Sequence, residues 1–167
     1  MQSIRSKIFI WIIRNRHIFR LKLKPEIVDE SFSVIKFRER VDKSSSRIKL
    51  PKNVTSQKLK INSITAEWII PQNPPEKKIL LYIHGGGFIS GSCLTHRMHV
   101  AKFANGSGIK SLVFDYRLAP ENPFPAGLED CIEVYLWLLQ QDYKPENIVI
   151  GGESAGGTLI LSLLLAL

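Results

Sequence analysis

The pattern of apolar and polar positions changes near residue 61, and the two parts of the chain predict different structures. In the first part, apolar residues recur at every third or fourth position, which predicts amphipathic helices over residues 1–24 and 26–41. The stretch 42–60 is polar and contains Pro51, so we expect a linker there. In the second part, short apolar runs alternate with longer helical patterns, which is typical of a parallel α/β sheet.

The strands expected in the second part are β-branched or continuously apolar and end at turn-forming residues. They cover residues 61–70, 79–83, 110–115 and 147–150. The run 79–83 is apolar without interruption, as expected of a strand that is buried on both faces. Helices are expected over residues 95–105, 126–140 and 154–167.

Glycines flank Ser154 where the last expected strand meets the last expected helix. Residues 152–156 read Gly-Glu-Ser-Ala-Gly, which fits the G-x-S-x-G pattern of a nucleophile elbow. In such an elbow a serine is held at the tip of a sharp turn between strand and helix. Gly152 and Gly156 give room for that turn, because a Cβ atom at either position would collide with neighbouring backbone. We therefore predict that Ser154 is exposed at the carboxyl edge of the sheet and is the candidate nucleophile.

A second glycine motif directly follows the expected strand 79–83. Residues His84–Phe88, here called the glycine loop, read His-Gly-Gly-Gly-Phe. An acyl-transfer enzyme needs uncovered N–H donors for the oxyanion that forms on its substrate, and consecutive glycines provide them. The pattern fits an HGGG-type oxyanion loop, which acts together with the N–H of the residue after the nucleophile, here Ala155. Gly85, Gly86 and Gly87 are all candidate donors, and the pattern does not decide between them.

The glycine motifs and the distribution of charge argue against nucleotides and nucleic acids as binding partners. Neither glycine run matches G-x-x-x-x-G-K-[ST] or G-x-G-x-x-G, so we set nucleotide binding aside. The net charge of +8 is concentrated in residues 1–60, which hold 16 of the 23 basic residues but 5 of the 15 acidic ones. No nucleic-acid-binding motif accompanies them, and we interpret this segment as a solvated basic face. Residues 1–24 contain no acidic residue, so weak contact with a membrane surface is a second interpretation.

The two cysteines, Cys93 and Cys131, lack the spacing of a metal site. We expect both to be reduced packing residues, which suits a cytoplasmic protein. No cofactor and no metal are expected. No stretch reaches the roughly 18 apolar residues of a membrane span.

Three blocks together resemble the hormone-sensitive-lipase-like branch of the α/β-hydrolase esterases. They are the glycine loop, the segment 115–130 with Asp-Tyr-Arg-Leu-Ala-Pro-Glu at its start, and Gly152–Gly157. The resemblance implies an α/β-hydrolase fold over residues 61–167, with a mostly parallel sheet and flanking helices. Residues 1–60 would then be a helical cap segment and linker.

The resemblance also implies an activity and roles for individual residues. The protein would be a serine carboxylesterase that acts on a small-molecule ester, with Ser154 as nucleophile. Four residues would support the site, namely His84, Gly152, Glu153 and Gly156. Many relatives have Asp where this chain has Glu153.

Several charged residues are expected to be structural. Arg117 and Glu121 are expected to pair and to brace the loop beneath the site, and Asp130 is given a similar role. His84 is expected to brace the backbone of the glycine loop. His96 and His99 are expected to form a surface pair without a metal.

The proton-transfer residues of a serine hydrolase are missing after Ser154. In this fold the order is Ser, then Asp or Glu, then His, but residues 155–167 contain none of these acids or bases. The last expected helix is apolar almost all round, as in the middle of a larger domain. We therefore expect the N-terminal portion of a longer esterase, inactive or nearly so by itself. The alternatives are a non-catalytic binding or interaction protein, and an amidase or lipase of the same mechanism.

Overall fold

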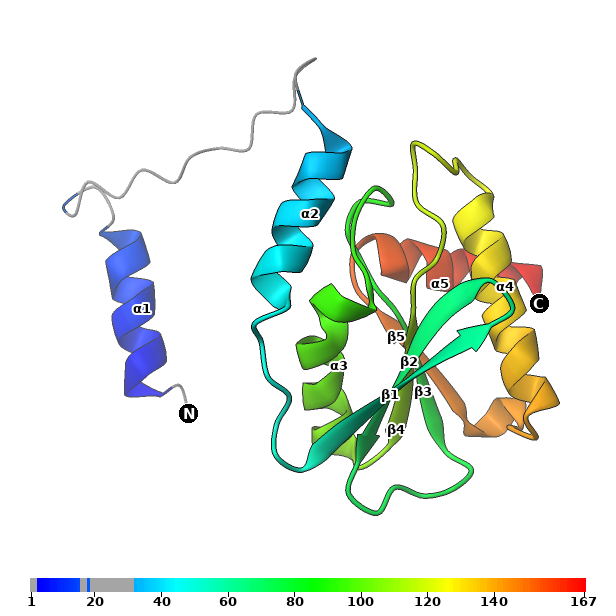
Figure 1. Cartoon of the computed structure of the whole chain (residues 1–167). Helices are drawn as coiled ribbons and strands as arrows, with labels where there is room; N and C mark the ends of the chain where they lie inside the picture. The colour runs from blue at the N-terminus through cyan, green and yellow to red at the C-terminus, as the bar shows by residue number, and fades with distance from the viewer. Residues whose placement is uncertain (1–2, 16–17, 19–31) are drawn as a thin grey trace. The chain divides into compact units, whose positions relative to one another are not determined.

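A computed structural model describes residues 3–15, 18 and 32–167 (Figure 1). The chain separates into two units, residues 1–32 and Ser33–Leu167, and each is described by itself. In the first, helix α1 spans Ile4–Arg14 and Ser3 caps its N-terminus. The helix expected over residues 1–24 therefore ends at Arg14, and residues 19–24 lie outside the described residues.

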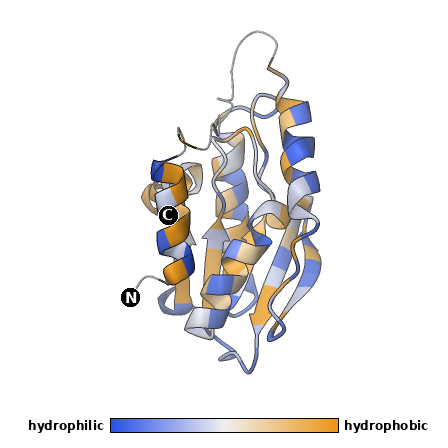
Figure 2. Cartoon of the chain, turned by 90° about the vertical axis from the view of Figure 1, so that its left-hand side faces the viewer, coloured by the Kyte–Doolittle hydropathy of each residue, from blue (hydrophilic) through white to orange (hydrophobic). Residues whose placement is uncertain are grey.

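Helix α1 carries large apolar side chains on most of its surface. Ile4, Phe9 and Trp11 are each more than half exposed, and none of its residues is buried. Figure 2 shows this helix, beside the mark of the N-terminus, with apolar (orange) and polar (blue) turns mixed. Within the described residues, no helix is long and apolar enough to cross a membrane.

The second unit begins with helix α2, Val34–Ser45, whose N-cap Ser33 accepts a hydrogen bond from the backbone N–H of Lys36. The prediction had placed this helix over residues 26–41. Residues 26–31 lie outside the described residues, and the helix continues four residues beyond the expected end.

Two antiparallel strands follow, and they correct the sequence-based boundaries. Strand β1, Val54–Ile61, pairs with β2, Ile64–Pro71. The expected linker is therefore wrong over residues 54–60, and the expected single strand 61–70 is broken by a turn at Asn62, which has a φ of 49°. Strand β1 was missed because it lies at the edge of the sheet, where most of its side chains face solvent and are polar.

The rest of the sheet is parallel and confirms the predicted fold class. Its strands lie in the order β1-β2-β4-β3-β5, and β3, β4 and β5 run in the same direction. The remaining elements are β3 Ile79–Ile83, α3 Cys93–Ser107, β4 Lys110–Phe114, α4 Ala126–Gln140, the 3₁₀ turn Pro145–Asn147, β5 Ile148–Gly152 and α5 Ala155–Ala166. Helix α4 has the predicted bounds.

The helices form a layer on each face of the sheet (Figure 1). Helix α3 packs on one face, in a core that contains Tyr82 and Val113. Helices α4 and α5 pack on the other face, in a core that contains Leu81 and Leu112. Neighbouring residues of one strand thus enter opposite cores, which is why these strands are apolar at consecutive positions. Cys93 and Cys131 are free and buried, as predicted.

The register of the parallel strands brings the two glycine motifs together. Ile83, the last residue of β3, pairs with Gly152, the last residue of β5. Because both strands run in the same direction, the glycine loop and Ser154 follow at the same edge of the sheet.

Candidate active site

Ser154 occupies a sharp turn between β5 and α5. Its backbone has φ 52° and ψ −123°, and the residue is exposed. A side chain with positive φ is strained by about 1–3 kcal/mol, and such strain collects at functional sites. In the part of the chain that the structure describes, the Oγ atom of Ser154 has no hydrogen-bond partner. The predicted elbow geometry is confirmed.

The glycines around Ser154 are required by close approach of the backbone. A Cβ atom built on Gly156 would overlap the carbonyl oxygen of Ile83, and a Cβ atom on Gly152 would overlap the same oxygen. The end of β3 therefore passes directly against the elbow. This confirms the predicted reason for both glycines.

The glycine loop turns back on itself immediately after β3. Gly86 has a φ of 126°, and a Cβ atom there would overlap the carbonyl oxygen of Ser90. The carbonyl oxygen of Gly86 accepts hydrogen bonds from the N–H groups of Ile89 at 3.2 Å and Ser90 at 3.0 Å. Glycine at this position is what allows so tight a turn.

The structure distinguishes between the three candidate glycine donors. The N–H of Gly85 donates to the carboxylate of Glu153 at 2.7 Å. By contrast, the N–H groups of Gly86, Gly87 and Ala155 donate to no protein acceptor among the described residues. Among the described residues, three uncovered donors therefore remain in the two motifs at this edge of the sheet.

His84 is buried in the interior and braces the glycine loop, as predicted. Its Nδ1 lies 2.8 Å from the carbonyl oxygen of Gly85. Because a carbonyl oxygen only accepts, Nδ1 carries the proton and Nε2 is the lone-pair atom. That Nε2 atom is buried and has no hydrogen-bond partner in the described part of the chain. Burial lowers the pKa of His84 to about 4, so the ring is neutral near pH 7.

The Glu153 carboxylate connects the elbow to its surroundings. It accepts hydrogen bonds from the Tyr82 hydroxyl and the Gly85 N–H, and it lies 3.0 Å from Nε2 of His96. Burial by itself raises the pKa of Glu153. The two hydrogen bonds and the electrostatic interactions with His96 and His99 outweigh that effect, so the net pKa of Glu153 is lowered and the group is ionised.

These contacts correct the prediction for the two α3 histidines. His96 is not a surface residue, because it is half-buried, stacks on His84 with a centroid distance of 5.1 Å and contacts Glu153. His99 is exposed and stacks on Phe103 instead. The two side chains therefore have different environments and do not form a pair.

Comparison with known proteins places this geometry in a family. A family model described as "alpha/beta hydrolase fold" matches residues 80–167, which include the glycine loop, the segment 115–130 and the elbow. The chain belongs to the α/β-hydrolase fold family.

Relatives of this chain confirm the resemblance to hormone-sensitive-lipase-like esterases. An acetyl-hydrolase from Streptomyces hygroscopicus is 37% identical over 107 residues, which are 64% of this chain and 36% of the relative. The hormone-sensitive lipase of Mus musculus is 35% identical over 95 residues, 54% of this chain and 12% of the relative. A solved esterase from the bacterial hormone-sensitive lipase family matches with a TM-score of 0.80 at 34% identity, covering 99% of this chain. The chain spans 52% of that esterase.

The segment 115–130 braces the candidate site through pairs other than the predicted one. Arg117 does not pair with Glu121. The Arg117 guanidinium lies 2.8 Å from the Asp130 carboxylate and 3.0 Å from the Glu129 carboxylate. The backbone N–H of Arg117 also donates to the buried Asp130 carboxylate, at 2.7 Å. The structural role expected for Asp130 is confirmed. The Arg117 side chain turns toward α4 because the helix presents two consecutive carboxylates there.

Glu121 instead pairs with Arg38 on helix α2, at 2.9 Å. This hydrogen-bonded pair lowers the pKa of the Glu121 carboxyl. Arg38 also donates to the carbonyl oxygens of Ile89 and Ala119, each at 2.6 Å. One side chain thus connects α2 to the two segments that follow β3 and β4. The sequence contains no signal for this role, because Arg38 is one of many basic residues in its segment.

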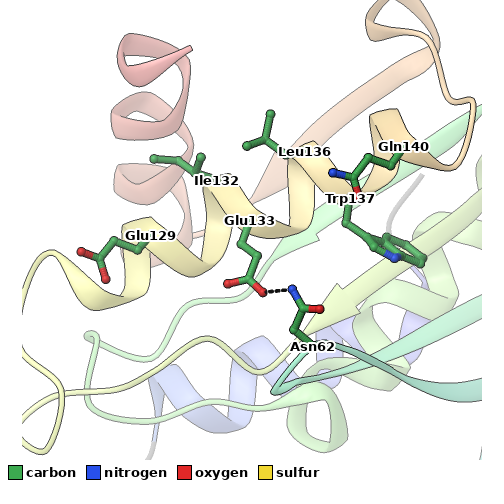
Figure 3. A pocket seen from close by; sticks show the side chains of 7 residues that line it. All are labelled: Asn62, Glu129, Ile132, Glu133, Leu136, Trp137 and Gln140. Carbon is green, nitrogen blue, oxygen red and sulfur yellow. Dashed lines mark hydrogen bonds between the residues drawn. The ribbon is translucent and has the colours of Figure 1, made fainter.

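The second unit also has a cavity of about 390 Å³ between the β1–β2 turn and α4 (Figure 3). Its lining combines apolar and polar side chains, namely Asn62, Glu129, Ile132, Glu133, Leu136, Trp137 and Gln140. Asn62 donates to Glu133 at 2.6 Å across it. None of these residues belongs to the glycine loop or the elbow, so the cavity adds nothing to the candidate site.

Proposed function

We propose that this chain supplies the nucleophile and the oxyanion hole of a serine carboxylesterase. The observation that carries the proposal is the strained, exposed Ser154 at the same sheet edge as three N–H groups that donate to no protein acceptor among the described residues. Gly86, Gly87 and Ala155 are the proposed oxyanion donors. Gly85 is left out because its N–H is already bonded to Glu153.

The proposed reaction has two stages. In the first, the Oγ atom of Ser154 attacks the ester carbonyl carbon and its proton passes to a base. The negative charge on the carbonyl oxygen is then stabilised by the three N–H donors, an effect in which one donor contributes about 3–4 kcal/mol. Collapse of this intermediate releases the alcohol and leaves an acyl-serine. In the second, water attacks the acyl group, the acid is released and Ser154 is regenerated.

The base and its orienting carboxylate are proposed to lie outside these 167 residues. Two observations support this. Residues 155–167 contain no Asp, Glu or His, and the buried His84 is committed to the carbonyl oxygen of Gly85. We therefore propose that the isolated chain has little or no esterase activity.

We further propose that α2 belongs to a cap segment within residues 1–60. The contacts of Arg38 with Ile89 and Ala119 support this, because they join α2 to segments beside the glycine loop. A cytoplasmic location stays part of the proposal. The free, buried cysteines are compatible with it.

Hydrolysis of a chromogenic short-acyl ester tests the function. The assay compares this chain with a longer protein that includes the coding sequence after codon 167, each with Ser154 and with Ser154→Ala. We expect turnover only in the longer protein with Ser154. Efficient ester hydrolysis by the 167-residue chain would contradict the proposed location of the base. If the longer protein hydrolyses the ester equally well with Ser154 and with Ser154→Ala, or not at all, the proposed esterase function is contradicted.

The second candidate is a non-catalytic binding or interaction protein on the hydrolase scaffold. The absence of an acid and a base after Ser154 favours it for this chain. A coding sequence that continues without an Asp and a His in family order would support this candidate over the enzyme.

A further inference from the structure

We propose that Glu153 is a positioning residue that, together with Tyr82 and His96, holds the glycine loop in the orientation its donors need. The inference rests on the proposed function, because orientation matters only if Gly86 and Gly87 bind an oxyanion. The proposal concerns the orientation of the two peptide groups on either side of Gly85, and their hydrogen bonding can be measured without enzymatic turnover.

A single carboxylate joins four parts of the site. Oε1 of Glu153 accepts from the Gly85 N–H at 2.7 Å and lies 3.0 Å from Nε2 of His96. Oε2 accepts from the hydroxyl of Tyr82. Glu153 directly precedes Ser154, so the elbow is connected to β3, to the glycine loop and to α3 through one side chain.

The contacts around Gly85 hold the first of two successive peptide groups at both ends and the second at its carbonyl oxygen. In the first group, the carbonyl oxygen of His84 accepts from the Tyr116 hydroxyl at 2.8 Å, and the N–H of Gly85 donates to Glu153. In the second group, the carbonyl oxygen of Gly85 lies 2.8 Å from Nδ1 of His84. The other end of this second group is the N–H of Gly86.

Peptide geometry carries that restraint to the proposed donor. A trans peptide is planar, and its N–H points opposite to its C=O. Fixing the carbonyl oxygen of Gly85 therefore fixes the direction of the Gly86 N–H. Because Gly85 has no side chain to restrict its own rotation, the bond to Glu153 supplies the restraint that a Cβ atom would otherwise give. A Cβ atom at Gly85 would in turn clash with Oε1 of Glu153 at 2.7 Å.

The Glu153 carboxylate is itself held by groups from two directions. Tyr82 reaches it from β3 and His96 from α3, while His99 contributes only at longer range. Nδ1 of His96 lies 2.8 Å from the Thr95 hydroxyl, which keeps Nε2 directed at the carboxylate. This arrangement explains how Glu153 can be ionised next to the nucleophile. Both of its carboxylate oxygens are occupied by these partners, so Glu153 does not act as the base.

Amide hydrogen exchange of the ¹⁵N-labelled 167-residue chain, followed by NMR, tests the proposal. In Glu153→Gln we expect the Gly85 amide to exchange at least about tenfold faster, because a charge-assisted hydrogen bond is replaced by a weaker one to a neutral amide oxygen. The exchange rate of the Gly85 amide in Glu153→Asp is expected to lie between the rates in the wild type and in Glu153→Gln. His99→Gln is the control, because His99 lies on α3 with His96 but has no hydrogen bond to Glu153 among the described residues; it is expected to leave Gly85 exchange unchanged.

The fold is checked in the same spectra, because general unfolding would accelerate amides throughout β3 and β4. Unchanged Gly85 exchange in Glu153→Gln, or an equal effect of His99→Gln, would overturn the proposal. Ser154→Ala separates it from the proposed function. That substitution is expected to abolish ester turnover of the longer protein and leave Gly85 exchange as it is. In the longer protein, Glu153→Gln is expected to lower kcat about tenfold with KM nearly unchanged.

Discussion

Two neighbouring glycines at the start of α5 are expected to respond in opposite ways to the same substitution. A Cβ atom at Gly156 would overlap the carbonyl oxygen of Ile83 and approach that of His84 to 2.8 Å. Neither backbone atom can rotate away, so α5 must move off β3. At Gly157 a Cβ atom meets nothing within 4 Å.

The structure sets the sign and size of each effect. Overpacking a tight contact costs about 1–3 kcal/mol and more where backbone must move, so Gly156→Ala is expected to destabilise by about 3 kcal/mol or more. Gly157→Ala fills open space within a helix, where alanine is favoured over glycine by about 0.5–1 kcal/mol. It is expected to stabilise the chain by about that amount.

Urea unfolding of the two variants and the parent chain, followed by far-UV circular dichroism, measures both free energies of unfolding. The slope with urea concentration reports whether the denatured state has changed. Equal effects of the two substitutions would refute the reasoning, because alanine has the same helix propensity at both positions. If Gly157→Ala destabilises the chain and Gly156→Ala does not, the close backbone contact lies at Gly157 and the reasoning is also refuted.

Four further outcomes follow from the same structure. The pKa of His84 is about 4 in the fold against 6.5 when unperturbed, so the unfolded chain binds more protons between these values and stability falls as pH falls. Between pH 7 and pH 5, the free energy of unfolding measured by urea titration is expected to fall by about 2 kcal/mol more in the wild type than in His84→Gln. Equal decreases would contradict a buried neutral ring. Arg38→Met removes charged hydrogen bonds to two carbonyl groups and is expected to cost about 2 kcal/mol, whereas Lys36→Met on the same helix, an exposed position, is expected to cost less than about 0.5 kcal/mol. Ser154→Gly is expected to be about 1 kcal/mol more stable than Ser154→Ala, because glycine accepts positive φ without strain; equal stabilities by thermal unfolding would count against a strained elbow. Deletion of residues 1–24 is expected to reduce sedimentation with anionic vesicles, and unchanged binding would exclude α1 as a membrane contact.

The candidate site could be predicted where its chemistry depends on short motifs. Ser154 and the glycine loop were recognised because each motif meets a local demand, a tight turn or an uncovered N–H. The bounds of α4 and β3 were also predicted, and those of β4 and β5 to within two residues, since continuous apolar runs have few alternatives. By contrast, β1 was missed because an edge strand shows its polar side chains to water.

The electrostatic partners could not be predicted from spacing. Arg117 was expected to pair with Glu121, four residues away, but pairs with Asp130 and Glu129 on α4. His96 was expected at the surface beside His99, yet it reaches Glu153. Charged side chains are long, and their partners are chosen by the packing of elements that are distant in sequence.

The sequence by itself determined the family, the elbow and the set of possible oxyanion donors, because these depend on residues that are adjacent in the chain. Only the tertiary structure decided which of the glycine N–H groups are uncovered. The reason is the register of β3 against β5, which brings Glu153 to Gly85 and leaves the N–H groups of Gly86 and Gly87 without an acceptor among the residues that the structure describes. It also decided that Gly156 touches the backbone of β3 and that Gly157 does not, although the two residues are identical neighbours in sequence.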